Sequence, residues 1–182
     1  MRIISGKYRG KQLLAPRNLP VRPTTDFAKE ALFNLLQNYF HLENIQVLDL
    51  FAGTGNISYE FASRGTQHIT AVDKNFLCVR YINQTTEKLA FTGLQAIKAD
   101  AVQFVNRAYQ KWDVIFADPP YDFAGYNELV DGVLSRKLLT EDGILVIEHG
   151  KYTSFSDHPN FFDERKYGNV HFSFFQLQEA ED

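Results

Sequence analysis

The chain has 182 residues, 45 % of them apolar, so it has room for one domain with a core of its own. No window reaches 18 uninterrupted apolar residues and the N-terminus lacks the apolar segment of a secretory signal, so we expect neither a membrane span nor export. The single cysteine, Cys78, has no partner for an internal disulfide, which is typical of a reducing compartment. We therefore expect a cytoplasmic protein that acts as a monomer and makes no contact with a membrane.

Charge is unevenly distributed along the chain. The net charge is -3, yet residues 1–25 hold six basic residues and no acidic one, which leaves -9 for the remainder. A basic arm on an acidic body attracts polyanions to one side of a protein. Apolar residues around Gly6 and Gly10 favour a short hairpin for this arm. A solvated, flexible tail is the alternative. The basic residues are Arg2, Lys7, Arg9, Lys11, Arg17 and Arg22.

After the arm, the pattern predicts one helix and then alternating strands and helices. The first helix is expected to begin near Thr24-Thr25-Asp26 and to end at Tyr39. Its predicted apolar face comprises Ala28, Ala31, Leu32, Leu35, Leu36 and Tyr39. Strands are predicted over residues 46–50, 68–72, 94–98, 113–117 and 144–148, helices over 56–64, 76–90, 101–109 and 126–134, and a closing hairpin over 161–167 and 171–177.

This alternation predicts an α/β fold with a central, largely parallel sheet covered by helices on both faces. We expect residues 1–25 to form the basic arm and residues 26–182 the main domain with its leading helix. Ligands of such sheets bind outside the carboxyl ends of the strands. Four aspartates fall at predicted strand ends: Asp49, Asp73, Asp100 and Asp118. Each alone also suits a turn or a helix cap, but four together favour a binding site.

A glycine-containing turn, residues 51–55, follows the first predicted strand and indicates a nucleoside site. It lacks the Gly-Lys-Ser/Thr of a P-loop, and Ser58 stands where a dinucleotide fingerprint has its last glycine or alanine. The alternative is an ordinary strand–helix connection. A cationic nucleoside, S-adenosylmethionine, fits the surrounding acids better than a pyrophosphate. Asp73 can accept from a ribose diol, Asp100 from the adenine amine, and Asp49 is expected near the ammonium and sulfonium. The candidate cofactor residues are Asp49, Phe51, Ala52, Gly53, Thr54, Gly55, Asp73, Lys74, Asp100 and Ala101.

The segment Asp118-Pro119-Pro120-Tyr121, at the end of the apolar run 114–117, predicts a catalytic loop for a flat base that bears an amine. Asp118 and a proline carbonyl can accept both N–H groups of an exocyclic amine and direct its lone pair at a methyl group. Tyr121 can stack on the ring, and Phe123 and Tyr126 are either further stacking residues or core. The base must be single-stranded or flipped out. A rigid turn without chemistry is the alternative reading.

No metal site is predicted. The five histidines, His41, His68, His149, His158 and His171, show no metal-ligand spacing. His149 follows the fifth predicted strand, where packing is favoured over a place in the cleft, and Cys78 is expected in the core.

The chain resembles the RsmD-type 16S ribosomal RNA (guanine-N2) methyltransferases of bacteria. The resemblance rests on residues 1–10 (MRIISGKYRG), 22–26 (RPTTD), 30–34 (EALFN), 47–55 (VLDLFAGTG) and 118–121 (DPPY), and it covers nearly the whole chain. The two N-terminal segments, 1–10 and 22–26 with the 30–34 that follows it, are the specific ones, because many amino-methyltransferases share the glycine and Asp-Pro-Pro-Tyr motifs. One departure is Phe27-Ala28-Lys29, where the family usually has arginines.

The resemblance implies a Rossmann-like class I methyltransferase sheet, mostly parallel with an antiparallel last strand. It implies methyl transfer from S-adenosylmethionine to N2 of guanine 966 in 16S rRNA, within the small ribosomal subunit or its assembly intermediate. Candidate RNA contacts are Arg2, Lys7, Arg9, Lys11, Arg22, Thr24, Thr25 and Lys29. Two alternatives remain. A DNA adenine or cytosine amino-methyltransferase uses the same loop but needs a target-recognition domain. A non-catalytic RNA-binding assembly factor could use the same fold.

Overall fold

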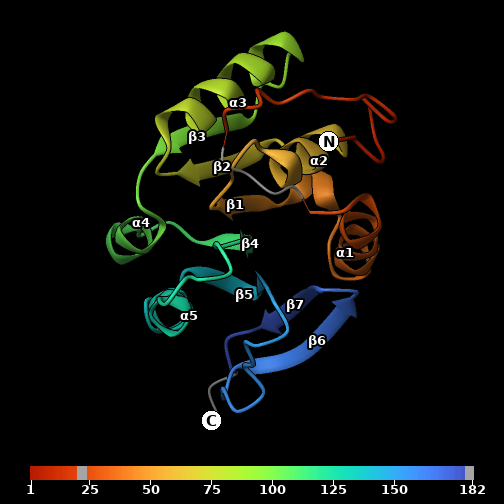
Figure 1. Cartoon of the computed structure of the whole chain (residues 1–182). Helices are drawn as coiled ribbons and strands as arrows, with labels where there is room; N and C mark the ends of the chain where they lie inside the picture. Colours follow the sequence, from red (N-terminus) through yellow and green to blue (C-terminus); the bar gives the residue numbers. More distant parts are fainter. Residues whose placement is uncertain (20–23, 179–182) are drawn as a thin grey trace.

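The computed structural model of the chain describes residues 1–19 and 24–178, which are built around one seven-stranded sheet (Figure 1). The strand order is β3-β2-β1-β4-β5-β7-β6. Strands β1 to β5 run parallel, whereas β7 pairs antiparallel with both β5 and β6. The strands are β1 (Gln46–Leu50), β2 (His68–Asp73), β3 (Leu94–Lys98), β4 (Trp112–Ala117), β5 (Leu139–His149), β6 (Phe161–Tyr167) and β7 (Val170–Phe175).

Helices cover both faces of the sheet, and each face has its own apolar cluster. The helices are α1 (Asp26–Tyr39), α2 (Asn56–Ser63), α3 (Phe76–Lys88), α4 (Ala101–Arg107) and α5 (Tyr126–Ser135), with a 3-10 turn η1 (Leu42–Asn44). Helices α1, α2 and α3 pack on one face, and α4 and α5 on the other (Figure 1). Among the described residues, no helix combines the length and apolarity needed to cross a membrane.

Side-chain caps explain where three helices begin. Thr25, Asn75 and Asp100 precede α1, α3 and α4, and each accepts a hydrogen bond from a backbone N–H of the first helical turn. Such caps satisfy donors that have no partner within the helix. Asn75 and Asp100 come directly after β2 and β3, so each cap also fixes how the chain turns at the carboxyl edge of the sheet.

The predicted fold is confirmed: an α/β sheet that is mostly parallel, with helices on both faces and an antiparallel last strand. Most helix and strand ends lie within two residues of the prediction, and two local predictions differ further. Strand β5 begins at Leu139, five residues earlier than predicted, because Leu139 pairs with Trp112. The buried face of α1 is rotated: Phe33 and Lys29 are buried, whereas Tyr39, expected in the core, is 52 % exposed.

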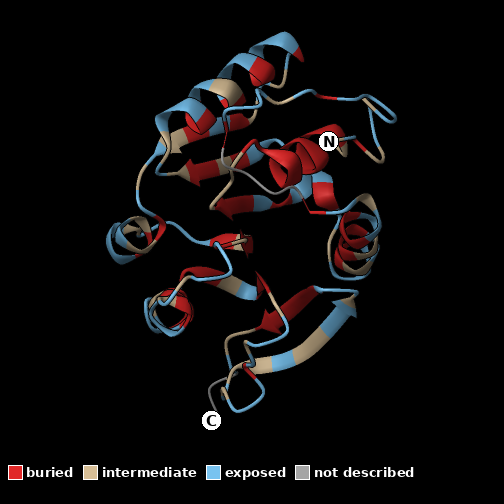
Figure 2. Cartoon of the chain, in the orientation of Figure 1, coloured by how far each residue is buried: buried red, intermediate tan, exposed pale blue. Residues whose placement is uncertain are grey.

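The first thirteen residues fold back on themselves and cover α2. Arg2 and Gln12 form an antiparallel bridge, and the backbone N–H groups of Ile4 and Ser5 donate to the Glu60 carboxylate at 2.9 and 3.0 Å. With the sheet beneath and the arm above, all eight residues of α2 are buried (Figure 2). A flexible tail is therefore not what the structure shows for this segment. The boundary between arm and domain near residue 25 stays a prediction.

Candidate active site

A cavity of about 340 Å³ opens at the carboxyl ends of the central strands. Its size lies in the range of small-molecule sites, which is about 300–1,000 Å³. The structure brings most of the predicted site residues together around it. Nine of the ten candidate cofactor residues line the cavity, Gly55 being the exception, as do all four residues of the candidate catalytic loop.

The turn between β1 and α2 forms one wall of the cavity in an unusual backbone conformation. Phe51, Gly53 and Gly55 have φ angles of 57°, 56° and 86°. A Cβ atom at Gly55 would lie 2.7 Å from the ring of Tyr59, so a side chain does not fit there. A positive φ is unfavourable for phenylalanine, and such strain is typical of functional loops. Phe51 is held in place by an edge-to-face contact with Phe123, with the ring centroids 5.1 Å apart.

Asp73, at the end of β2, organises the adjoining wall. Its two carboxylate oxygens accept hydrogen bonds from the backbone N–H groups of Gly53 and Asn75, both at 2.8 Å. Because each carboxylate oxygen has a second lone pair, the group keeps acceptor capacity toward the cavity. Asp100, after β3, caps α4 by accepting from the N–H of Gln103 at 3.0 Å.

Asp49 lies at the floor of the cavity and is only 1 % exposed. The hydroxyl of Ser58 donates to its Oδ2 at 2.6 Å. Burial raises the pKa of Asp49 to about 7, and the Ser58 hydrogen bonds only partly oppose that effect. The carboxyl group therefore changes its charge near neutral pH, and a cation bound beside it would favour the ionised form.

The loop after β4 faces this wall across the cavity. The backbone N–H of Asp118 donates to the carbonyl of Leu50 at 3.3 Å, which ties the loop to the end of β1. The carbonyl of Pro120 accepts from the N–H of Phe123, so the carbonyl of Pro119 is the better candidate to receive a substrate N–H. Tyr121 is 46 % exposed on the rim.

The structure also shows where Phe123 and Tyr126 lie, the two aromatic residues for which the sequence allowed either stacking or a place in the core. Tyr126 belongs to the core cluster beneath the loop and is not among the cavity residues, and Phe123 is half-buried between Phe51 and Tyr126. Burial, followed by the charge of Asp118, raises the pKa of Tyr126 to about 12. Both rings support the loop from behind.

Glu148 is a cavity residue that the sequence analysis missed. It is 4 % exposed at the end of β5, and the hydroxyl of Thr24 donates to its Oε2 at 2.7 Å. The available signal was the one used for the aspartates, an acidic residue at a strand end. With Glu148, the described residues that line the cavity include five carboxylates and one cationic side chain, Lys74. This balance favours a cationic ligand.

The candidate RNA contacts are scattered. Lys7, Arg9 and Lys11 are exposed on the arm, Thr24 and Thr25 line the cavity, and Arg2 forms an ion pair with Asp26 at 3.0 Å. Arg22 lies outside the described residues.

For Lys29 the prediction of an RNA contact is wrong. Its side chain is fully buried, and its ammonium donates to the carbonyl of Arg2 and to Oδ1 of Asn56 and pairs with Glu60 at 3.3 Å. An ammonium with three partners in the interior is not available to a ligand outside.

Comparisons with known proteins find relatives of this chain among rRNA methyltransferases. A Bacillus subtilis (strain 168) protein named "Putative rRNA methyltransferase YlbH" is 35 % identical over 155 residues, which cover 83 % of each chain. Ribosomal RNA small subunit methyltransferase D of Escherichia coli (strain K12) is 26 % identical over 148 residues, 81 % of this chain and 74 % of that protein.

Two solved structures show the same fold. A protein from Escherichia coli titled as a methyltransferase, yhhF, superposes with a TM-score of 0.85 at 25 % identity over 98 % of both chains. A Thermus thermophilus 16S rRNA N2 G1207 methyltransferase, solved with AdoMet and guanosine, gives a TM-score of 0.70 at 20 % identity, covering 88 % of this chain and 45 % of that one.

The fold is therefore that of the class I S-adenosylmethionine-dependent methyltransferases, with the cavity at the edge of the sheet where such folds bind ligands. The family model described as "Conserved hypothetical protein 95" matches residues 1–176, and the chain belongs to this family of RsmD-type methyltransferases.

Proposed function

We propose that the cavity binds S-adenosylmethionine. The acidic lining suits a ligand with a sulfonium and an ammonium, and Asp49 at the floor is the candidate partner for these charges. Asp73 supplies the acceptor for a ribose diol, and Asp100 is the candidate acceptor for the adenine amine. The residues present thus fit each polar part of this cofactor.

We further propose that the protein methylates the exocyclic N2 of a guanine. The bound cofactor supplies an electrophilic methyl group. Asp118 and the carbonyl of Pro119 accept the two N–H bonds of the amine, which orients the nitrogen lone pair toward that methyl. As the new N–C bond forms and the S–C bond breaks, the nitrogen becomes acidic and Asp118 receives its proton. Tyr121 on the rim stacks against the base.

The proposed substrate is 16S rRNA in the small ribosomal subunit or its assembly intermediate, at guanine 966. Family membership supports this proposal, because the matched Escherichia coli relative is named a small subunit rRNA methyltransferase. The observation that carries the enzymatic part is the cavity itself, which joins the acidic cofactor wall to the Asp118-Pro119-Pro120-Tyr121 loop.

The distance between the basic arm and the cavity supports the proposal of a large RNA substrate. The hydroxyl of Tyr8 donates to the carbonyl of Leu89, at the end of α3 away from the cavity. The backbone N–H of Lys7 donates to the carbonyl of Ser63, at the corresponding end of α2. Thirteen helical residues, at about 1.5 Å each, place this end of α3 about 20 Å from its start at the cavity. An RNA that contacts both the arm and the cavity must span this distance.

The direct test is methyl transfer from labelled S-adenosylmethionine to small subunits purified from a strain that lacks the modification. We expect label in 16S rRNA, and mass spectrometry should map it to N2 of guanine 966. Label on another nucleotide would reject the position, and label only on a DNA control would reject the RNA substrate. Absence of transfer despite cofactor binding would support a non-catalytic assembly factor.

The arm is tested separately with Lys7, Arg9 and Lys11 replaced together by glutamine. We expect weaker binding to small subunits and a shallower dependence of log K on log salt, by about 0.7–0.9 per lost phosphate contact. Lys98, Lys111 and Lys137, replaced in the same way, provide a control that removes equal charge from other surfaces. Equal losses in both triple variants would show that only net charge matters.

A further inference from the structure

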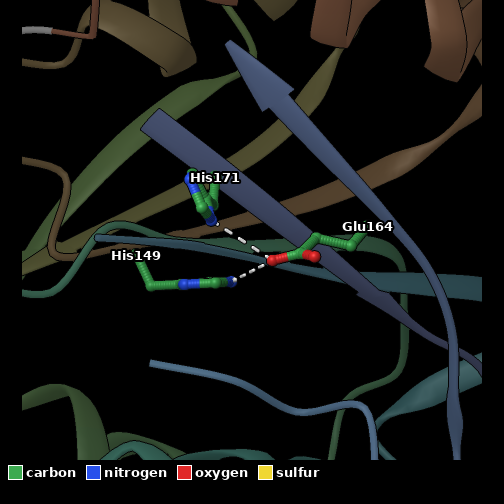
Figure 3. A group of neighbouring side chains, drawn as sticks. All are labelled: His149, Glu164 and His171. Carbon is green, nitrogen blue, oxygen red and sulfur yellow. Dashed lines mark hydrogen bonds and ion pairs between the residues drawn. The ribbon is translucent and has the colours of Figure 1, made fainter. Parts of the chain in front are cut away.

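Two histidines and a glutamate converge between the last three strands of the sheet, outside the cavity. His149 at the end of β5 lies opposite His171 on β7, and Glu164 reaches them from β6 (Figure 3). Their ligand atoms all lie within 4.8 Å of one another. We propose that His149, Glu164 and His171 form a binding site for one divalent transition metal ion, of which zinc is the best match.

The orientation of His149 favours metal ligation. Its Nδ1 lies 2.9 Å from the carbonyl of Gly150, and because a carbonyl only accepts, Nδ1 carries the hydrogen. In the neutral ring Nε2 then carries a lone pair, which accepts the hydrogen bond of the Ser173 hydroxyl at 2.7 Å and lies 3.9 Å from Oε1 of Glu164; a metal ion would take the place of that hydroxyl hydrogen. A histidine that binds a metal commonly donates its other N–H to a carbonyl in this way, which fixes the ring for ligation.

The spacing of the ligand atoms is close to what a metal requires. In a tetrahedral zinc site with bonds of about 2.0–2.1 Å, neighbouring ligand atoms lie about 3.3 Å apart. Oε1 of Glu164 lies 3.3 Å from Nδ1 of His171 and 3.9 Å from Nε2 of His149. All three ligand atoms lie within 4.8 Å of one another, so binding a metal requires the side chains to move closer together. The hydroxyl of Ser173, 2.7 Å from Nε2 of His149, stands at the fourth side, where it or a water can complete the shell.

The three side chains are largely shielded from solvent, as ligands of a metal in a protein commonly are. The side chain of His149 is fully buried, that of His171 is 11 % exposed, and that of Glu164 is 27 % exposed, which leaves an entry path from the surface. The second oxygen of Glu164, Oε2, pairs with Lys166 at 3.3 Å, so Oε1 is the oxygen that faces the histidines. Two imidazoles and one carboxylate suit zinc better than magnesium or calcium, which prefer oxygen ligands.

Metal at this site would join β5, β6 and β7 through side chains, in addition to their backbone pairing. The sequence analysis predicted no metal, because the three ligands are 15 and 7 residues apart and fit no short motif. Strand pairing places His149 directly across from His171, and Glu164 across from Ser173. The relation becomes visible only when the register of the antiparallel strands is known.

Zinc binding by the metal-free full-length protein tests the proposal. We expect one equivalent of Zn²⁺ by calorimetry, an increase in Tm, and d–d absorption of a low-symmetry site when Co²⁺ replaces zinc. Replacing a residue that only supports a metal ligand lowers metal affinity roughly 10–100-fold. In Glu164→Gln and in His171→Gln, where a ligand itself is replaced, the zinc affinity should fall by more than that. His41→Gln, at an exposed histidine remote from the cluster, should bind as the wild type does.

Absence of stoichiometric zinc binding by the wild type would overturn the proposal, as would equal affinity in all three variants. Circular dichroism of each metal-free variant shows whether it is folded, and the partly exposed position of Glu164 on the edge strand β6 makes Glu164→Gln the variant least prone to misfold. These readouts do not depend on methyl transfer, so the site can be rejected while the proposed activity stands.

Discussion

Replacing Asp49 by asparagine should stabilise the protein and impair cofactor binding at the same time. The carboxyl group is buried at the cavity floor with one side-chain donor, Ser58. Burial raises its pKa from the usual 3.8 to about 7. In the folded protein without ligand, ionisation of this group is therefore unfavourable, and an uncharged isostere removes that cost.

The sign and size of the contribution that Asp49 makes to the free energy of unfolding follow from the difference between its pKa in the folded and in the unfolded state. Between pH 3.8 and about 7 the folded state holds a proton that the unfolded chain has lost, so this stabilising contribution is complete below pH 3.8 and disappears as the pH rises through 7. The difference of about 3 pH units, at about 1.4 kcal/mol each, corresponds to about 4 kcal/mol lost above pH 7. Asparagine carries no charge at any pH, and its Oδ1 can still accept from Ser58.

Urea unfolding of the wild type and Asp49→Asn at pH 5 and pH 8.5 measures this effect. The advantage of the variant should grow by about 2–3 kcal/mol between the two pH values, which for a chain of this size is about 5–10 °C in Tm. Asp142→Asn, at an exposed position, serves as the control and should show no such growth. By calorimetry at pH 8, Asp49→Asn should bind S-adenosylmethionine about 10–100-fold more weakly, because a charged hydrogen bond is lost.

A stability advantage that does not change with pH would refute the reasoning about burial. If the variant bound the cofactor as tightly as the wild type, the proposed contact with the cationic part of the ligand would be wrong, whatever the unfolding data show. The two measurements thus separate the electrostatics of the fold from the proposed position of the cofactor.

Three further outcomes are expected. Asp118→Asn should lower the rate of methyl transfer by at least about 100-fold while calorimetry still detects cofactor binding, since the residue orients the amine and accepts its proton; an unchanged rate would exclude that role. Asp73→Ala should weaken cofactor binding at least about 10-fold, the scale of one lost hydrogen bond to a charged group, and a Kd like that of the wild type would rule out the ribose contact. Glu60→Ala should cost about 3–5 kcal/mol in urea unfolding, because it leaves the Lys29 ammonium buried without its counter-ion, and the added change Lys29→Met should recover part of that loss; a double variant no more stable than Glu60→Ala would contradict this explanation.

The fold could be predicted because its strands are short apolar runs that end in recognisable turns. Strands β1 and β3 begin and end where predicted, and β2 and β4 differ by one residue. Parallel strands present their carboxyl ends at one edge, so the aspartates that follow them could be grouped before any coordinates were known. The cavity lining shows that all four of these aspartates do meet there.

The features that were missed depend on pairings between distant segments. Glu148 takes its place in the cavity wall with Thr24, which is 124 residues away. His149, His171 and Glu164 meet because β7 runs antiparallel between β5 and β6. No local pattern in the chain encodes such a register, since a shift of one residue would turn each of these side chains to the other face of the sheet.

Lys29 is a different kind of error, because the chain did contain a signal. Leu32, Phe33 and Leu36 follow it at +3, +4 and +7, the spacing of one helical face, so Lys29 belongs to the N-terminal end of the buried stripe that packs on α2. A lysine on such a stripe requires a buried acid, and Glu60 is the acid in α2, where it also receives the N–H groups of Ile4 and Ser5. The carboxylate of Glu60 therefore neutralises the charge of Lys29 in α1 and also anchors the backbone of the arm. An acid in the interior thus holds the backbone of the arm against the domain, and the exposed side chains of Lys7, Arg9 and Lys11 remain available to a polyanion outside.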